Sequence, residues 1–213
     1  MKAWLFDLDG TLADTIEDIA ASVDAVRARF GLSAIGVEAV RPMVGDGLGA
    51  LLRRALSRGG VALSEKDLEM AGEFYVSHHE AQCTRTVRLY PGVRDFLERL
   101  AGAGHPLAVV TNKPLRFARA IARHLRLDDL IPVVIGGDSL PQRKPDPAPL
   151  LCALQRLGVL DRQGTMVGDS PGDIAAGRAA GLETIACLYG YRPAEALIAS
   201  GPDRFWRRFG GDD

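Results

Sequence analysis

The 213-residue chain has few cysteines and almost no net charge. Cys83, Cys152 and Cys187 are odd in number, far apart and in no CxxC arrangement. Neither a disulfide framework nor a cysteine zinc site is therefore indicated, and we expect a reducing, cytoplasmic compartment. A formal net charge of -1 gives the chain no electrostatic attraction to nucleic acid or to an anionic membrane.

Long apolar runs are also absent. No stretch approaches the length of about 20 residues that a membrane-spanning helix needs. Charged Asp7 comes too early for the apolar segment of a signal peptide. The hydrophobic fraction of 47% is ordinary for a globular protein. We therefore expect no membrane partner. For the oligomeric state, we expect a monomer or homodimer.

Short apolar or β-branched runs that end at a polar residue recur along the chain and indicate strands. They are AWLFDL, PLAVVTN, IPVVIGG, TMVGD and ETIACL. Segments of helical length separate the later runs: VRDFLERLAGAG, PLRFARAIARHL, PAPLLCALQRLG and PGDIAAGRAAG. This alternation predicts an α/β fold with a doubly wound (Rossmann-like) parallel sheet and helices on both faces. Ligands of such sheets bind beyond the carboxyl ends of the strands.

The interval between the first two strands contains only helical patterns. They are TIEDIAASVDAVRARFG, GDGLGALLRRALSRGG and SEKDLEMAGEFYVSHHEAQC. Because an interval of about 70 residues is too long for a single crossover, we predict a small α-helical cap domain inserted after strand 1. The predicted domains are core residues 1–15, cap residues 16–86 and core residues 87–213.

Local signals mark some ends of these segments. Thr15 with Asp18, and Ser64 with Asp67, have the spacing of a capping box, which predicts where the first and third cap helices begin. The final residues, WRRFGGDD, form a short tail that we expect to be frayed.

The first strand ends in two carboxylates, Asp7 and Asp9, followed by Gly10 and Thr11. Residues i and i+2 of a strand share a face, so both carboxylates are expected to point the same way. Two such close carboxylates need a cation or a retained proton, and both are useful in catalysis. Taken alone, the motif is explained as well by a calcium-type loop or a plain acidic turn as by a catalytic site. The rest of an EF-hand loop is absent, however.

Other strand ends carry further polar residues. They are GDSPGD from Gly168 to Asp173, VTNK from Val110 to Lys113, and Lys144 in RKPDP. Each has a purely structural interpretation as well, such as a capping box for Ser170 with Asp173. Convergence of all of them on one edge of a parallel sheet favours an active site.

In their order along the chain, these four motifs resemble the haloacid dehalogenase-like phosphohydrolases. The resemblance covers almost the whole chain, and the helical insertion is similar to that family's cap domain. More narrowly, VGDGLGALLRRAL, VTNKP, VVIGGDSLPQRKPDPAPLL and LYGYRPAEA are similar to the bacterial phosphoglycolate phosphatases. The resemblance implies Mg2+-dependent hydrolysis of a small phosphate monoester through an aspartyl-phosphate.

The same resemblance implies the catalytic roles. Asp7 would attack phosphorus, and Asp9 would act as general acid and then general base. Thr111 and the Asn112 amide would hold the phosphoryl oxygens. Lys144 would balance the negative charge of the nucleophile and the phosphoryl group.

A metal site is implied in the same way. The Mg2+ ligands would be the Asp7 carboxylate, the Asp9 backbone carbonyl and Asp169, which form an all-oxygen set. Asp173 would orient this site or bind through water, with Ser170 beside it.

Selectivity is expected to come from the cap. Gly45, Asp46 and Gly47 are predicted to form a turn that leads into a helix. The exposed amides of that helix could meet the carboxylate of 2-phosphoglycolate. Arg54 aligns with a basic position of the subfamily motif and is a second candidate for that carboxylate. The glycines would serve equally as plain turn residues. Other possible substrates are N-acetylmuramic acid 6-phosphate and sugar phosphates.

Several alternatives are less favoured. Related β-phosphoglucomutases have a histidine in the segment after the first motif, and TIEDIAASVD has none. Dehalogenases of the superfamily lack the second acid, which is Asp9 here. A non-catalytic binding module would be free to lose Asp7 or Lys144. His78 and His79 are not interpreted as a metal pair, because adjacent helical residues point in different directions.

Overall fold

A computed structural model describes residues 1–58, 63–159 and 163–212. All five strands expected from the sequence are present, and they pair in parallel in the order β5-β4-β1-β6-β7. Their bounds are β1 (Ala3–Phe6), β4 (Leu107–Val110), β5 (Val133–Ile135), β6 (Gly164–Gly168) and β7 (Glu183–Cys187). In this register Phe6 lies beside Val109 and Val167. The predicted α/β fold with a parallel sheet is confirmed.

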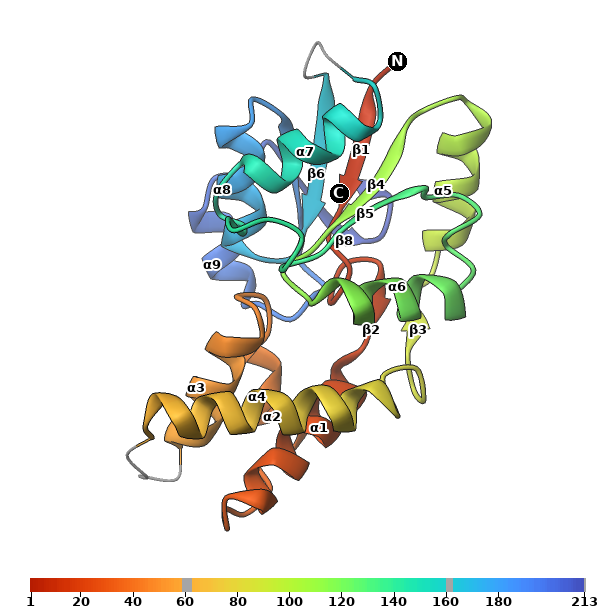
Figure 1. Cartoon of the computed structure of the whole chain (residues 1–213). Coiled ribbons are helices and arrows are strands. Elements are labelled where there is room, and N and C mark those ends of the chain that lie inside the picture. Colours follow the sequence, from red (N-terminus) through yellow and green to blue (C-terminus); the bar gives the residue numbers. More distant parts are fainter. Residues whose placement is uncertain (59–62, 160–162, 213) are drawn as a thin grey trace.

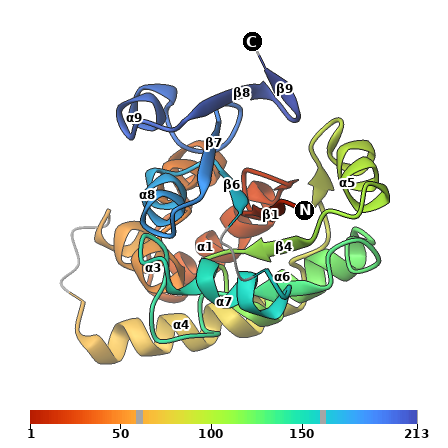
Figure 2. The same cartoon turned by 90° about the horizontal axis from the view of Figure 1, so that it is seen from above.

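Helices cover both faces of the sheet (Figure 2). Side chains of alternate strand residues, such as Phe6 and Val109, pack with α5 (Val93–Gly102) and α6 (Leu115–His124). Their neighbours pack on the other face with α7 and α8. The bounds of those helices are α7 (Ala148–Arg156) and α8 (Pro171–Ala179). The sheet is therefore doubly wound, as the alternation predicted.

The helical insertion after β1 lies below the strand ends in Figure 1. A short antiparallel pair, formed by β2 and β3, holds its two ends together. The elements are β2 (Ala13–Asp14), α1 (Ile16–Arg29), α2 (Gly36–Val40), a 3-10 helix (Arg41–Met43), α3 (Leu48–Ser57), α4 (Glu65–Glu80) and β3 (Arg88–Leu89). The three predicted helical patterns correspond to α1, α3 and α4. Residues 59–62 of the predicted cap lie outside the described residues, and its bounds at 16 and 86 stay a prediction.

The insertion has a hydrophobic core of its own. Ile19 and Val23 of α1 pack there with Leu52 of α3. Two side chains from outside the insertion, Phe117 of α6 and Tyr191, belong to the same cluster. The cap core therefore continues onto the edge of the sheet where the strands end.

One of the two predicted capping boxes is correct. Ser64 and Asp67 cap α4 reciprocally. Thr15 makes no such bond, because its hydroxyl donates to Asp9 Oδ1 at 2.7 Å. Asp18 instead accepts hydrogen bonds from the backbone and hydroxyl of Thr86. Tertiary partners thus replace the local cap at α1, where the prediction was wrong.

As far as Asp212, where the described residues end, the C-terminal tail is not frayed, which corrects the prediction from sequence. After α9 (Ala194–Ala199), β8 (Arg204–Arg208) pairs in parallel with β7, and β9 (Gly211–Asp212) pairs antiparallel with β8. Trp206 is 2% exposed and stacks on Trp4. The exposed residues on both sides of Trp206 hid this strand, because only one side chain is buried.

Candidate active site

Three carboxylates meet at the carboxyl edge of the sheet. Asp7 follows β1, Asp169 follows β6, and Asp173 lies in the first turn of α8. All three are buried, and each offers an oxygen within 4.8 Å of those of the others. Sequence spacing had assigned Asp7, Asp169 and Asp173 to one edge, and the structure brings them together.

Lys144 lies against this cluster. Its Nζ is 2.5 Å from Asp173 Oδ1 and 3.1 Å from Asp7 Oδ1, and it donates to the Val110 carbonyl at 2.6 Å. Burial lowers the pKa of Lys144, but the Asp173 and Asp7 carboxylates outweigh burial, so the pKa lies above its ordinary value. Lys144 is therefore a buried positive charge.

The cluster has the properties of a cation site. Three carboxylates and one ammonium leave two negative charges without a partner. Burial, together with the charges of Asp7 and Asp173, raises the pKa of Asp169 well above its usual range. Asp7 Oδ1 is buried, and its partner among the described residues is the Lys144 ammonium. An all-oxygen set with more negative charge than Lys144 can balance fits a hard divalent cation.

The loop after β1 packs tightly on Asp169. Gly10 has φ +81°, and a Cβ there would lie 2.3 Å from Asp169 Oδ2. Thr11 donates its hydroxyl to Asp169 Oδ1 at 3.3 Å, and the Tyr191 N–H donates to Oδ2 at 2.7 Å. Only glycine fits at position 10, because any side chain would displace this carboxylate.

Asp173 is held on both sides. Its Oδ2 accepts from the Ser170 hydroxyl at 2.7 Å and the Ser170 N–H at 3.0 Å, which completes the capping box of α8. Its Oδ1 faces Lys144. Burial and the charge of Asp7 raise the pKa of Asp173 although Lys144 opposes them. The capping box that the sequence indicated for Ser170 and Asp173 is therefore present, and Asp173 is also a member of the acid cluster.

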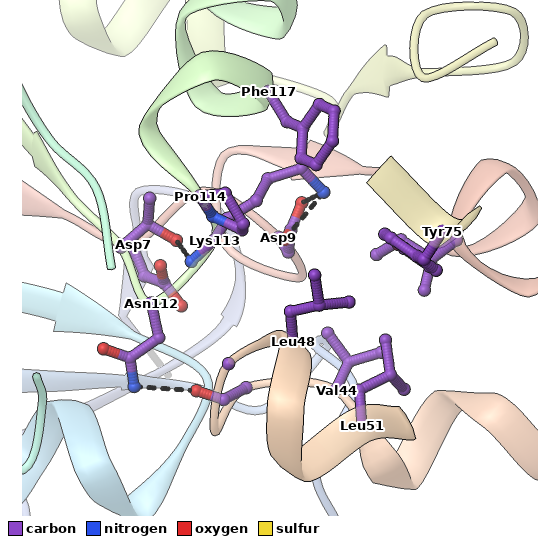
Figure 3. Close-up of a pocket in the computed structure, with 14 residues that line it drawn as sticks. Asp7, Asp9, Val44, Leu48, Leu51, Tyr75, Asn112, Lys113, Pro114 and Phe117 are labelled. Carbon is purple, nitrogen blue, oxygen red and sulfur yellow. Dashed lines mark hydrogen bonds and ion pairs between the residues drawn. The ribbon is translucent and has the colours of Figure 1, made fainter. Parts of the chain in front are cut away.

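Asp9 faces a different set of partners. Its two carboxylate oxygens each lie 3.1 Å from Lys113 Nζ (Figure 3), and Oδ1 also accepts from Thr15. The Tyr191 hydroxyl accepts from the Thr15 N–H and donates to Asp14. Sequence reasoning had noted Lys113 as a cation in VTNK but gave it no partner, and it missed Tyr191. Lys113 and Tyr191 lie at least 104 residues along the chain from these partners, so no local sequence pattern indicated the contacts.

Thr111 and Asn112 follow β4. Thr111 is buried, and its hydroxyl accepts from the Lys113 N–H at 3.2 Å. The Asn112 side chain donates to the carbonyls of Lys144 and Gly45, both at 3.0 Å, and accepts from the Lys144 N–H. It therefore joins the Lys144 loop to the cap.

A pocket lies between these groups and the cap (Figure 3). The sheet side contributes Asp7, Asp9, Thr111, Asn112 and Lys113, with Pro114 and Phe117. The cap side is mainly apolar and comprises Ile19, Val44, Gly45, Gly47, Leu48, Leu51 and Tyr75. Gly45 and Gly47 have φ of +119° and +88°, so the turn into α3 uses conformations that glycine favours.

Arg54 is not among the residues that line this pocket. Its guanidinium contacts Asp46 Oδ2 at 2.5 Å and the Met43 carbonyl at 3.0 Å. Asp46 also accepts from Arg192 at 2.8 Å. Burial raises the pKa of Asp46, but the two arginines more than reverse this and lower it. In this structure Arg54 supports the glycine turn.

Comparison with known proteins agrees with this geometry. Residues 4–187 match the model of the haloacid dehalogenase-like hydrolase family. The chain therefore belongs to that family, and it is an enzyme. Within the described residues, no helix is long and apolar enough to cross a membrane.

Named relatives show which members of the family this chain resembles. The chain is 42% identical over 205 residues to a protein of Pseudomonas putida named phosphoglycolate phosphatase, with 93% of this chain and 73% of that protein covered. A protein of the same name from Chromobacterium violaceum is 41% identical over 200 residues, covering 93% and 90%. A crystal structure described as a predicted phosphoglycolate phosphatase from Haemophilus somnus superimposes with a TM-score of 0.91 at 32% identity, covering 98% and 95%.

Proposed function

We propose that the protein is a Mg2+-dependent phosphatase that hydrolyses 2-phosphoglycolate to glycolate and phosphate. The names of its relatives support the substrate. The observation that carries the chemistry is the buried cluster of Asp7, Asp169 and Asp173, with Lys144 Nζ 3.1 Å from Asp7. A phosphate monoester is already anionic, so its attack by a carboxylate requires compensating positive charge, which Lys144 and a cation held by the three carboxylates would supply.

Asp7 is the proposed nucleophile. Its carboxylate oxygen forms a bond to phosphorus while the bond from phosphorus to the glycolate oxygen breaks, which leaves an aspartyl-phosphate. The proton that the departing oxygen needs comes from Asp9. Lys144, fixed between Asp7 and Asp173, stabilises the added negative charge.

The second step returns Asp7 to its initial state. Asp9 takes a proton from water, the water oxygen bonds to phosphorus, and the bond from phosphorus to Asp7 breaks. Thr15 and Lys113 hold the Asp9 carboxylate from two sides. These contacts keep one carboxylate beside the departing glycolate oxygen in the first step and beside the attacking water in the second.

Mg2+ would be held by the Asp7 carboxylate, the Asp9 backbone carbonyl and Asp169, with Asp173 beside them. When bound, it supplies the positive charge that the cluster lacks and that the phosphoryl oxygens require. Thr111 and Asn112 are the proposed contacts for those oxygens. For Asn112 this role falls to the backbone amide, because the side chain is already bonded on both ends.

The cap, proposed as residues 16–86 between core segments 1–15 and 87–213, would exclude water and select the substrate. The pocket wall that it contributes is mainly apolar. The proposed contact to the glycolate carboxylate is the turn at Gly45 and Gly47, which precedes α3 and has no side-chain cap. Arg54 would act through Asp46 to hold this turn.

A panel of phosphate esters tests the proposal. We expect kcat/KM for 2-phosphoglycolate to exceed that for glucose 6-phosphate and N-acetylmuramic acid 6-phosphate by more than about tenfold, or about 1.4 kcal/mol. Phosphate release should stop with a chelator and return with Mg2+. Equal rates across the panel would remove 2-phosphoglycolate as the selected substrate, and conversion of β-glucose 1-phosphate to glucose 6-phosphate would favour a mutase.

A further inference from the structure

The pocket contains a single cationic side chain among its lining residues, all of which the structure describes. That side chain is Lys113, which follows Asn112 in the loop after β4. Its ammonium lies beside Asp9 (Figure 3), and the cap residues that line the same pocket include Leu48 and Tyr75. Lys144 contacts the acid cluster and is absent from the pocket lining.

We propose that the Lys113 ammonium binds the carboxylate of the substrate and so determines selectivity for phosphate esters of a hydroxy acid. The inference rests on the proposed function and assigns its substrate-recognition group. It replaces Arg54 as the cation expected to meet this carboxylate, because the Arg54 guanidinium is bound to Asp46 and the Met43 carbonyl.

The chemistry of the substrate places its carboxylate next to Lys113. In 2-phosphoglycolate a single CH2 separates the ester oxygen from the carboxylate. Asp9 must contact that ester oxygen in order to protonate it. Because Lys113 Nζ lies 3.1 Å from both oxygens of Asp9, a carboxylate one carbon away from the ester oxygen falls within reach of the same ammonium.

The hydrogen-bonding capacity of Lys113 agrees with this role. An ammonium has three N–H donors. In the described part of the chain, the Asp9 carboxylate is the hydrogen-bond partner recorded for Lys113 Nζ. With two donors directed at the Asp9 oxygens, one remains for a ligand. The side chain is 5% exposed, so a carboxylate that reaches it gains a charge-assisted hydrogen bond in a site with little access to water.

The test compares two esters that differ only in the carboxylate. They are 2-phosphoglycolate and 2-hydroxyethyl phosphate, in which CH2OH replaces the carboxylate. For the parent we expect a ratio of kcat/KM values above about 10 in favour of 2-phosphoglycolate, and for Lys113→Met a ratio at least about tenfold smaller. Lys113→Arg, which keeps the charge, should retain more of the ratio than Lys113→Met.

A role limited to holding Asp9 has a different outcome. Loss of Asp9 alignment would lower turnover of both esters equally and leave their ratio unchanged, which would overturn the proposal. The non-hydrolysable acid 3-phosphonopropionate and neutral propylphosphonate provide a second readout by calorimetry. The parent should bind the acid more tightly, and Lys113→Met should lose that difference.

Controls separate the possible failures. Lys66→Met removes a lysine from the exposed face of α4 and should keep the parental ratio. Lys113→Gln keeps a hydrogen bond to Asp9 without the charge, so it gives the same comparison if Lys113→Met does not fold. A parental ratio near one would contradict both the proposed substrate and this inference, whereas a high parental ratio that persists in Lys113→Met would contradict the Lys113 assignment alone.

Discussion

The two sides of the pocket differ in chemistry. The sheet side presents Asp7, Asp9 and Lys113, all buried. The cap side presents mainly aliphatic and aromatic residues, such as Leu48 and Tyr75. Two charged side chains of the cap beside the glycine turn, Asp46 and Arg54, form an ion pair with each other instead of lining the pocket.

The difference separates two tasks. Charge on the sheet side supplies catalysis, and an apolar cap that excludes water strengthens every electrostatic interaction beneath it. The cap needs little chemistry of its own if Lys113, the lysine proposed to bind the substrate, comes from the sheet side. Changes on the sheet side should therefore affect turnover most, and changes in the cap should affect stability and KM.

The largest effect is expected from Asp7→Asn. Loss of the proposed nucleophile should lower kcat by at least about 10^4-fold in a phosphate-release assay. The same change removes one of three mutually repelling buried carboxylates, whose charge raises the pKa of Asp169. The variant should therefore melt at or above the parental temperature in the presence of a chelator. Parental turnover in this variant would contradict the assignment of Asp7.

Lys144→Met tests the charge balance of the sheet side. Removing the ammonium leaves Asp7 and Asp173 buried without their partner, which should cost about 3–5 kcal/mol in the free energy of unfolding. Activity should fall about 10^3-fold, because the developing phosphoryl charge is no longer stabilised. Urea denaturation and initial rates measure the two effects.

A second substitution separates stability from catalysis at Lys144. In the double variant Lys144→Met, Asp173→Asn, one uncompensated carboxylate is neutralised, so much of the lost stability should return while activity stays low. Recovery of activity with stability would mean that Lys144 serves only the fold.

The sheet side was also the part that sequence could predict. Asp7, Lys144 and Asp169 follow strands or sit in short motifs, and parallel strands end at one edge, so local patterns were enough to bring them together. Trp206 escaped prediction because a strand with one buried side chain shows no alternation. Its burial depends on the aromatic side chains of distant elements, such as Trp4.

Contacts of the cap were harder to predict, since they depend on tertiary partners. Thr15 and Ser64 both have the capping-box spacing, yet only Ser64 caps a helix, because Asp9 lies within reach of the Thr15 hydroxyl. Arg54 had the right charge and neighbourhood for a substrate contact, but Asp46 takes its guanidinium. Spacing alone cannot rank such competing partners.

The apolar cap side should make stability sensitive to pH through His79. This ring is buried against Tyr75 and Phe117, and its Nδ1 lies 2.9 Å from the Ser22 hydroxyl. Burial and, secondarily, the charge of Lys113 lower the pKa of His79 from 6.5 to about 2. Below pH 6.5 the unfolded chain therefore takes up a proton that the folded chain does not, and stability falls as the pH falls.

Between pH 7 and pH 5 this linkage should cost about 2 kcal/mol. His79→Gln, which can still bond Ser22, should lose that part of the pH dependence in urea titrations, whatever its stability at pH 7. His124→Gln, at an exposed position of α6, is the matched control. An identical pH dependence for His79→Gln and the parent would show that His79 is not the group responsible.

The smallest effect on activity and stability is expected from replacing Arg192, which joins the core to the cap through a partly exposed ion pair. Arg192, in the loop between β7 and α9, donates to the Pro42 carbonyl at 2.7 Å and to Asp46 at 2.8 Å. Because Asp46 is 43% exposed, Arg192→Met should change the free energy of unfolding by less than about 1 kcal/mol. It should raise KM about threefold with little change in kcat, since the cap loses one contact that joins it to the core.

A double-mutant cycle shows whether this contact acts across the two sides. If the pair with Asp46 carries the effect, Arg192→Met should raise KM much less when Asp46 is already asparagine. Added salt should raise the parental KM in the same direction, because screening weakens an exposed ion pair. Additive effects of the two substitutions would mean that the pair with Asp46 does not carry the effect, which would leave the bond from Arg192 to the Pro42 carbonyl as its source.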